Sequence, residues 1–312
     1  MRPERLAFIR RLNAMASACN EPLLINNGDS DHNERAKQLR SGLCVMLFSS
    51  LEDFVRERIA QVVDNIKSSA VPFSSLPQAF QNAATVEALS SLGFQAQFVS
   101  ADRKLRFLMD ELKKLGSLGE QNYSLSKYSF GHSKTNLLSS EFEAVLTGFN
   151  VEKPYETIFR TIQRLQLGAV NSAKTAFENL SGSRHSAAHD QSYEIPSADF
   201  LNNISSAFSI GLAFDVVLSC AALNLRNSYA ATRGGLSVMR AADIGIFTIS
   251  NKPVRGNFLL RQEGGRRAIF KGNNLSVVRA EGVRRLAGLV AVLVVQDSSG
   301  RPIEWYCKSS GD

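Results

Sequence analysis

Residues 207–225 read AFSIGLAFDVVLSCAALNL, and this apolar stretch decides the class of fold. Its side chains are hydrophobic on most faces of a helix, which is the pattern of a helix buried on all sides. The stretch predicts a helix from Ser197 to Leu225 that lies at the centre of a bundle.

Amphipathic patterns on the N-terminal side predict the remaining helices. From Glu34 to Val63 apolar residues recur at helical spacing, after a cluster of good N-cap residues at 29–33. Shorter patterns predict further helices at 101–115, 139–146, 154–165 and 171–189, with a polar loop at 119–136. We therefore expect the chain to be all-α up to about residue 231.

The hydrophobic period changes after Gly235. Short apolar runs separated by Gly, Asn and Pro turns predict strands at IGIFTI, GNFLLRQ, RRAIFK, LSVVRA, AGLVAVLVVQD and IEWYCK. The expected fold is mainly α: a helical bundle with a small C-terminal β-rich, barrel-like domain. The bundle takes residues 1–232, with its core at 33–229 and an inserted region at about 70–150, and the β domain takes 243–312.

Composition limits the class of protein. The chain has 312 residues, 44% hydrophobic and 21% charged, which fits a soluble globular protein and excludes a disordered one. Its four cysteines form no C-x-x-C pair, so we expect neither a zinc ribbon nor a disulfide framework. The N-terminus lacks the apolar run of a signal peptide, and the run Leu286–Val295 is too short to cross a bilayer. We expect a cytoplasmic protein with no membrane partner.

The positive charge is concentrated near the C-terminus. Residues 231–312 hold 13 Lys and Arg against 6 Asp and Glu, while the net charge of the chain is +7. Basic residues on both sides of the turn at Gly264-Gly265 predict a hairpin tip that binds nucleic acid. These residues are Arg261, Arg266, Arg267 and Lys271. The alternative is that the charges protect sheet edges and that the nearby aromatic residues only fill a core.

Two of the four histidines lie in LSGSRHSAAHDQSY, residues 180–193. His185 and His189 are spaced like a zinc-binding pair, but position 186 is Ser rather than the Glu of H-E-x-x-H, and no third ligand presents itself. A serine nucleophile for acyl transfer would be expected in a G-x-S-x-G turn, and the sequence has no such motif. We expect no metal and no cofactor.

Phosphodiester cleavage is the third chemistry that these residues could perform. A histidine can move protons near neutral pH, and an arginine fork can hold a phosphate. Arg184 and His189 are five residues apart, or about 140° around a helix, so they converge best on a ligand across the helix end or on a dimer seam. Two copies on a two-fold axis would pool two arginines and two histidines.

Arg184-HSAA-His189 resembles the R-x4-H signature of HEPN domains, in which a polar residue such as His185 follows the arginine. The long early helix, with LFSSLEDFVRERI and the acidic Glu52, is similar to the first helix of the family. KTNLLSSEFEAVLTGFNVEKPYETIFRTIQRL, the motif helix and the apolar closing helix resemble the RiboL-PSP subgroup, over about 33–229.

The resemblance implies a bundle that dimerises at the motif and acts as a metal-independent endoribonuclease, in phage defence or as a toxin, with a possible regulatory partner protein. Arg184 would polarise the phosphate and His189 would be the general acid and base, supported by His185 and Glu52. Tyr193 lies two positions later than the tyrosine of the R-x4-H-x-Y subgroup, so regulation through it is not expected.

Two other functions stay open. Some HEPN domains are silent RNA-binding or protein-interaction modules, and a metal hydrolase at the two histidines would lose its activity to a chelator. In purely structural roles, Arg184 would cap its helix or pair with Asp190, and Glu52 would form a surface pair with Arg56.

Overall fold

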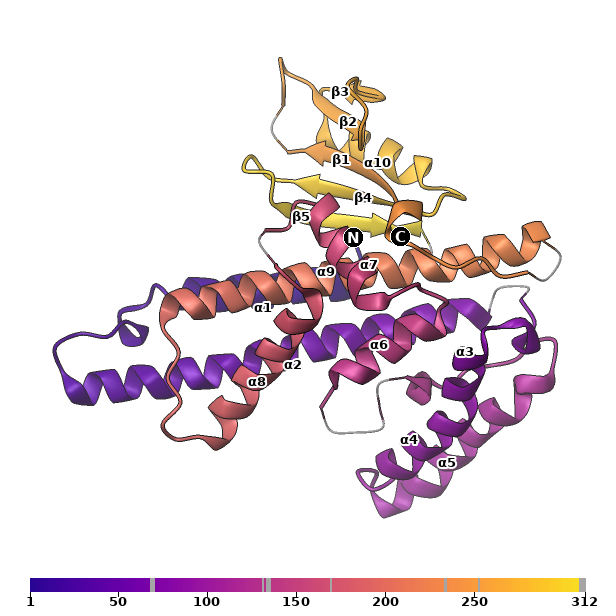
Figure 1. Ribbon diagram of the computed structural model, residues 1–312, viewed down its shortest axis with the longest axis horizontal. Coiled ribbons are helices and arrows are strands. Elements are labelled where there is room, and N and C mark those ends of the chain that lie inside the picture. The colour runs from indigo at the N-terminus through magenta and orange to yellow at the C-terminus, as the bar shows by residue number, and fades with distance from the viewer. Residues whose placement is uncertain are drawn as a thin grey trace.

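The computed structural model describes residues 1–67, 71–130, 132, 136–168, 170–232, 235–251 and 253–308. Two long helices, α2 (Ser30–Lys67) and α9 (Ser197–Thr232), pack against each other and against α1 (Pro3–Ala18) in the middle of the molecule (Figure 1). The predicted early helix and the predicted apolar helix are confirmed as α2 and α9. The predicted junction near 231–243 lies partly outside the described residues, at 233 and 234.

Further helices complete the bundle. They are α3 (Gln78–Asn82), α4 (Ala88–Gln95), α5 (Ala101–Gly116), α6 (Ser139–Gly148), α7 (Pro154–Arg164) and α8 (Ala173–His189), with a π-helical turn at Ala83–Glu87. Short 3-10 turns occur at Pro22–Leu24, Phe73–Ser75, Ser117–Gly119, Lys127–Ser129 and Ala241–Asp243. The four shorter helices predicted from periodicity are present, and the predicted loop at 119–136 contains one 3-10 turn and lies in part outside the described residues.

Helix α9 is the centre of the core. The window Ser197–Ala231 is long and apolar enough to span a membrane, but 94% of the tested part is buried inside the protein, as expected for a core helix. Gly211 allows α1 to approach closely, because a Cβ there would stand 2.7 Å from the ring of Phe8. A larger residue would push α1 away from α9.

The C-terminal part forms an open five-stranded sheet rather than a barrel. The strands are β1 (Gly245–Ser250), β2 (Phe258–Gln262), β3 (Phe270–Gly272), β4 (Ala291–Gln296) and β5 (Pro302–Cys307), in the order β3-β2-β1-β4-β5. Strands β1 and β4 are parallel, and the other pairs are antiparallel. The mainly α fold with a β-rich C-terminal part is confirmed.

One predicted strand is wrong. LSVVRA begins a helix, α10 (Leu275–Arg285), and not a strand. Asn274 caps this helix, since its Oδ1 accepts a hydrogen bond of 2.8 Å from the N–H of Ser276. A helix is also what the topology needs, because β4 runs parallel to β1 and a parallel strand requires a crossover connection.

The sheet lies between the bundle and α10. Ile246, Val292 and Trp305 point to one side and belong to the same hydrophobic cluster as the bundle. Phe247 and Leu293 point to the other side and pack against α10. Trp305 and Phe247 are therefore core residues and offer no stacking platform for bases, which favours the structural interpretation for these two aromatic residues.

Candidate functional site

Helix α8 presents the R-x4-H motif in its last turns. The helix starts at the cap Ser172, whose Oγ accepts a hydrogen bond from the N–H of Thr175, and it buries Phe177 and Leu180 against the bundle. The helix ends at His189. The buried first half thus fixes the direction of an exposed second half.

The two histidines lie side by side on the surface. His185 and His189 are exposed, and their ring centroids are 4.8 Å apart. Within the part of the chain that the structure describes, no group of three or more His, Cys, Asp and Glu side chains is placed to hold a metal ion. Both imidazoles can be reached by a ligand at the end of α8.

Arg184 lies on a different side of α8 and is half-buried near Glu52 of α2. The Glu52 carboxylate accepts a 2.6 Å hydrogen bond from the N–H of Leu137 and forms a 2.8 Å ion pair with Arg56. Burial raises the pKa of Glu52, while the positive charges of Arg56 and Arg184 act to lower it. The structure thus places Arg184 within electrostatic range of Glu52, and Glu52 is buried rather than one half of a surface pair.

Arg184 and His189 do not meet within one chain. Among the described residues no hydrogen bond or ion pair joins them, which agrees with their separation of about 140° around the helix. Asp190 is also not bound to Arg184, since its carboxylate accepts hydrogen bonds of 2.8 and 2.6 Å from the N–H and the hydroxyl of Ser192. The alternative in which Arg184 pairs with Asp190 is therefore wrong.

The segment after His189 is held by contacts that the sequence did not predict. The phenol of Tyr193 lies close to Ser183, next to Arg184, and to Cys44 of α2, and burial raises the pKa of Tyr193. Arg40 of α2 is buried and donates hydrogen bonds to the carbonyl oxygens of Ile195 at 2.9 Å and of Leu24 at 2.7 Å.

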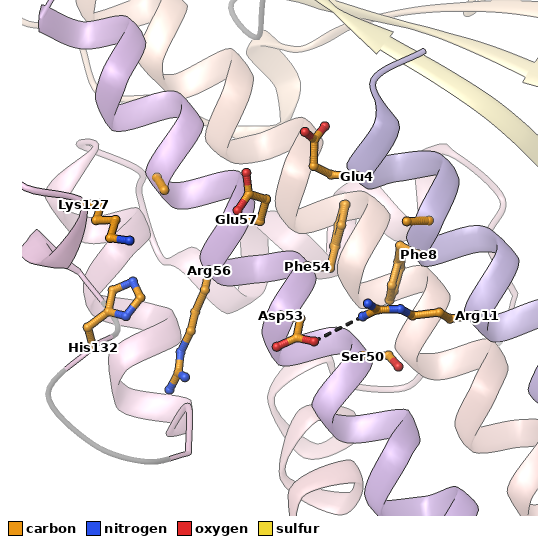
Figure 2. Close-up of a pocket in the computed structure, with 12 residues that line it drawn as sticks. Glu4, Phe8, Arg11, Ser50, Asp53, Phe54, Arg56, Glu57, Lys127 and His132 are labelled. Carbon is orange, nitrogen blue, oxygen red and sulfur yellow. Dashed lines mark hydrogen bonds and ion pairs between the residues drawn. The ribbon is translucent and has the colours of Figure 1, made fainter. Parts of the chain in front are cut away.

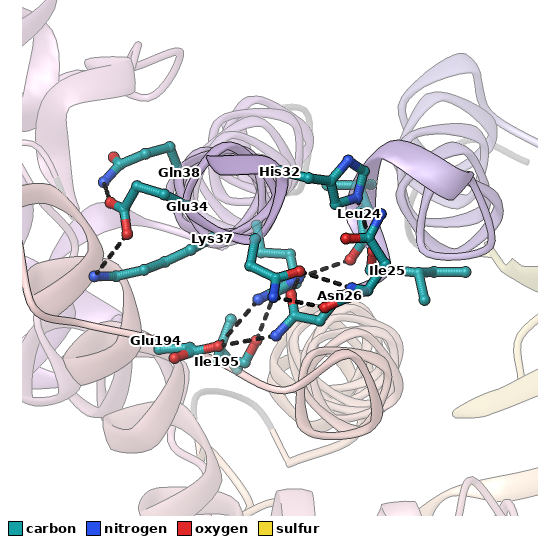
Figure 3. A network of polar contacts seen from close by, with 12 residues as sticks. Leu24, Ile25, Asn26, His32, Glu34, Lys37, Gln38, Glu194 and Ile195 are labelled. Atoms are coloured by element: carbon teal, nitrogen blue, oxygen red, sulfur yellow. Dashed lines mark hydrogen bonds and ion pairs between the residues drawn. The ribbon is translucent and has the colours of Figure 1, made fainter. Parts of the chain in front are cut away.

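Arg40 also contacts Glu194 at 3.3 Å and Asn26 at 2.9 Å, so it joins the α1–α2 loop to the α8–α9 connection (Figure 3). Its guanidinium offers five donors in a planar fork, which suits contacts in several directions. The signal in the sequence was an arginine between the apolar positions of an amphipathic helix.

The basic hairpin forms as predicted between β2 and β3. Gly264 adopts a φ of +74°, and the N–H of Gly265 donates to the carbonyl of Gln262 at 3.0 Å. Strand register pairs Leu259 with Lys271, which places Lys271 and Arg261 on the same face of the sheet. Figure 1 shows this hairpin at the edge of the sheet farthest from the bundle.

The hairpin cations differ from the cations of α10. Within the described ranges none of the four predicted hairpin residues forms an ion pair, and all four are exposed: Arg261, Arg266, Arg267 and Lys271. By contrast, Arg279 is paired with Glu304 at 2.9 Å, and both Arg284 and Arg285 are paired with Glu281 at 2.7 Å. The hairpin therefore carries positive charge that no carboxylate neutralises among the described residues.

Comparison with known families supports the architecture. The RiboL-PSP-HEPN family matches residues 9–219, which include α2, the motif helix α8 and most of α9. The chain belongs to this family. The match begins at residue 9, inside α1, and so extends further toward the N-terminus than the resemblance over about 33–229.

Membership gives the motif a context. HEPN domains are frequently ribonucleases, so this HEPN protein has an expected role in RNA biology. No curated protein and no solved structure matches the chain. The roles of individual residues in this HEPN domain are therefore argued from its own geometry.

Proposed function

We propose that the protein is a metal-independent endoribonuclease that cleaves RNA by attack of a ribose 2′-OH on the neighbouring phosphate. The observation that carries the proposal is the placement of Arg184 and His189 on the last turns of α8, in a chain of the HEPN family. Arg184 lies beside the buried Glu52, and His189 lies at the exposed helix end. The site thus combines a phosphate-binding fork with a group that exchanges protons.

The chemistry needs two proton transfers. As the 2′-oxygen bonds to phosphorus, its proton passes to one histidine, the bond from phosphorus to the 5′-oxygen breaks, and the leaving oxygen takes a proton from a second histidine. The products are a 2′,3′-cyclic phosphate and a 5′-OH. Arg184 stabilises the added negative charge on the phosphate.

A homodimer supplies the second histidine. In one chain the two motif side chains point in different directions, so a complete site needs the ends of two α8 helices on a two-fold axis. His185 supports the site as the neighbour of His189, at 4.8 Å between ring centroids. Glu52 holds the α2 side of the site in place.

The unpaired cations of the β2–β3 hairpin serve as an RNA-binding surface beside the nuclease. We place this activity in the cytoplasm, in phage defence or as a toxin, where a regulatory partner protein would restrain it. The four cysteines are buried thiols, which fits a reducing compartment.

The test is incubation of the purified protein with cellular RNA and excess EDTA, beside the variants Arg184→Ala and His189→Ala. We expect cyclic-phosphate ends from the wild type and a loss of at least a hundredfold in rate in each variant. Lys174→Ala, an exposed change in the first turn of α8, is the matched control and keeps activity. Intact RNA with the wild type, together with RNA binding, would favour a silent binding module, and activity lost to EDTA would favour a metal hydrolase.

A further inference from the structure

A cavity of about 400 Å³ opens between α1, α2 and the side chains of Lys127 and His132 (Figure 2). Its floor is apolar, and the rings of Phe8 and Phe54 stack there with centroids 4.3 Å apart. The wall is charged and contains Glu4, Arg11, Asp53, Arg56, Glu57, Lys127 and His132. An apolar floor below a polar wall suits a ligand that has both a flat ring and charged or hydrogen-bonding groups.

One side of the cavity is basic. Arg56, Lys127 and His132 lie together in Figure 2. Burial, together with the positive charges of Arg56 and Lys127, lowers the pKa of His132 to about 4. The imidazole is therefore neutral at pH 7, and its N–H can donate a hydrogen bond to an anion that Arg56 and Lys127 attract. A phosphate group suits this side in charge and in hydrogen bonding.

The other side of the cavity is acidic. Glu4 and Glu57 lie near the upper rim in Figure 2, while the charge of Asp53 is balanced by Arg11 at 3.1 Å. The Oε2 atom of Glu4 is buried and has no hydrogen-bond partner among the residues that the structure describes. Buried acceptors normally have a hydrogen-bond donor, so we expect this oxygen to accept a hydrogen bond from an N–H group of a bound ligand.

The basic side of the cavity borders the candidate nuclease site. Arg56, which lines the cavity, is ion-paired with Glu52, and the charge of Arg184 acts on the same carboxylate. A single strand whose scissile phosphate lies at Arg184 can therefore place a neighbouring nucleotide in the cavity.

We propose that this cavity is a subsite for one guanosine nucleotide of the RNA substrate, with its phosphate at Arg56, Lys127 and His132 and its base edge at Glu4 and Glu57. The choice of base follows from hydrogen bonding. Carboxylates only accept, and guanine presents two adjacent donors, its imino and amino groups, whereas uracil presents one donor between two carbonyl groups. The assignment of RNA as the source rests on the proposed nuclease function.

The first experiment measures binding of 5′-GMP, 5′-UMP and inorganic phosphate to the full chain by titration calorimetry. We expect 5′-GMP to bind roughly tenfold or more tightly than 5′-UMP. Glu4→Gln should abolish this preference, and Lys127→Ala should weaken both nucleotides and phosphate by a similar factor. Lys113→Ala on α5 is the matched control outside the cavity and should change nothing.

Glu57→Gln, at an exposed position, provides the second variant if Glu4→Gln does not fold. Equal affinity for the two nucleotides, or binding that neither glutamine variant alters, would overturn the proposal. These measurements need no cleavage, so they can succeed or fail independently of the nuclease assignment.

A competition experiment identifies the source of the nucleotide. Because His189→Ala should bind RNA without cutting it, 5′-GMP should displace guanine-containing RNA from this variant. Binding of 5′-GMP that leaves RNA affinity unchanged would mean a free nucleotide effector and would overturn the substrate assignment.

Discussion

The indole Nε1 of Trp305 donates a hydrogen bond of 2.7 Å to Oδ2 of Asp215, 90 residues earlier in the chain. Trp305 lies on β5 and Asp215 lies on α9, and both are fully buried. The same carboxylate accepts from Arg5 of α1 at 2.6 Å and from Arg58 of α2 at 2.7 Å. One aspartate of α9 thus joins α1, α2 and the sheet.

Asp215→Asn should destabilise the whole molecule. The change removes the negative charge that two buried guanidinium groups share, and breaking a buried pair in this way costs about 3 to 5 kcal/mol of unfolding free energy. Helix content and Trp305 fluorescence, followed during urea unfolding, should shift together. If Asp215→Asn shifts the fluorescence transition but not the loss of helix content, the sheet unfolds separately from the bundle.

The exposed pair of Arg11 and Asp53 is the matched control for this prediction. Both side chains are more than half exposed, so Asp53→Asn should change the unfolding free energy by no more than about 1 kcal/mol.

The stabilising effect of Asp215 should also depend on pH. Burial alone would raise the pKa of this carboxyl, but the charges of Arg5 and Arg58 and their hydrogen bonds outweigh it and hold the pKa well below its usual range. A lowered folded-state pKa contributes stability above the unfolded value, about 3.9, and this contribution is lost as the pH falls further. The difference in unfolding free energy between wild type and Asp215→Asn should therefore shrink below about pH 4. A difference that stays constant down to pH 2 would contradict the ionised assignment.

The limits of sequence reasoning are visible in these same residues. The apolar run around Asp215 predicted a buried helix, yet its ion-pair partner Arg5 lies 210 positions away, and periodicity carries no information on such pairs. The motif of Arg184 and His189 is local and was found. The predicted strand at LSVVRA was wrong. Its β-branched residues favour a strand, but the crossover to β4 and the cap at Asn274 favour a helix.

Arg40→Ala should loosen the two loops that the side chain joins. Removal of the guanidinium leaves the buried carbonyl groups of Leu24 and Ile195 without donors, at a cost of about 1 to 3 kcal/mol. Amide hydrogen exchange should rise at 24–27 and at 190–195, next to His189. Gln38→Ala, an exposed change on the same helix, should leave exchange in both segments as in the wild type. Unchanged exchange in Arg40→Ala would exclude a role of Arg40 in joining the two loops.

Glu52→Gln should have a larger effect in acid than at neutral pH. Burial raises the pKa of Glu52 despite Arg56, so the folded protein holds this proton more tightly than the unfolded chain does. The wild type therefore loses stability as the pH rises from about 4.3 through the folded-state pKa, and the glutamine variant lacks this loss. Unfolding by urea at pH 4 and pH 7 should show the smaller penalty for Glu52→Gln at pH 7. The opposite order would mean that the ion pair with Arg56 outweighs burial.

The β2–β3 hairpin should carry a large share of the affinity for RNA. Arg266 and Arg267 form no ion pair among the described residues, so a phosphate can bind them without displacing a carboxylate. The double variant Arg266→Ala/Arg267→Ala should weaken binding of single-stranded RNA and reduce the slope of log affinity against log salt by about 0.7 for each lost phosphate contact. Arg284→Ala/Arg285→Ala removes the same formal charge from α10, where both side chains are already paired with Glu281. This control should leave the slope nearly unchanged, because Glu281 already neutralises part of the charge that it removes. Equal losses in the two double variants would mean that net charge alone, and not the hairpin, attracts RNA.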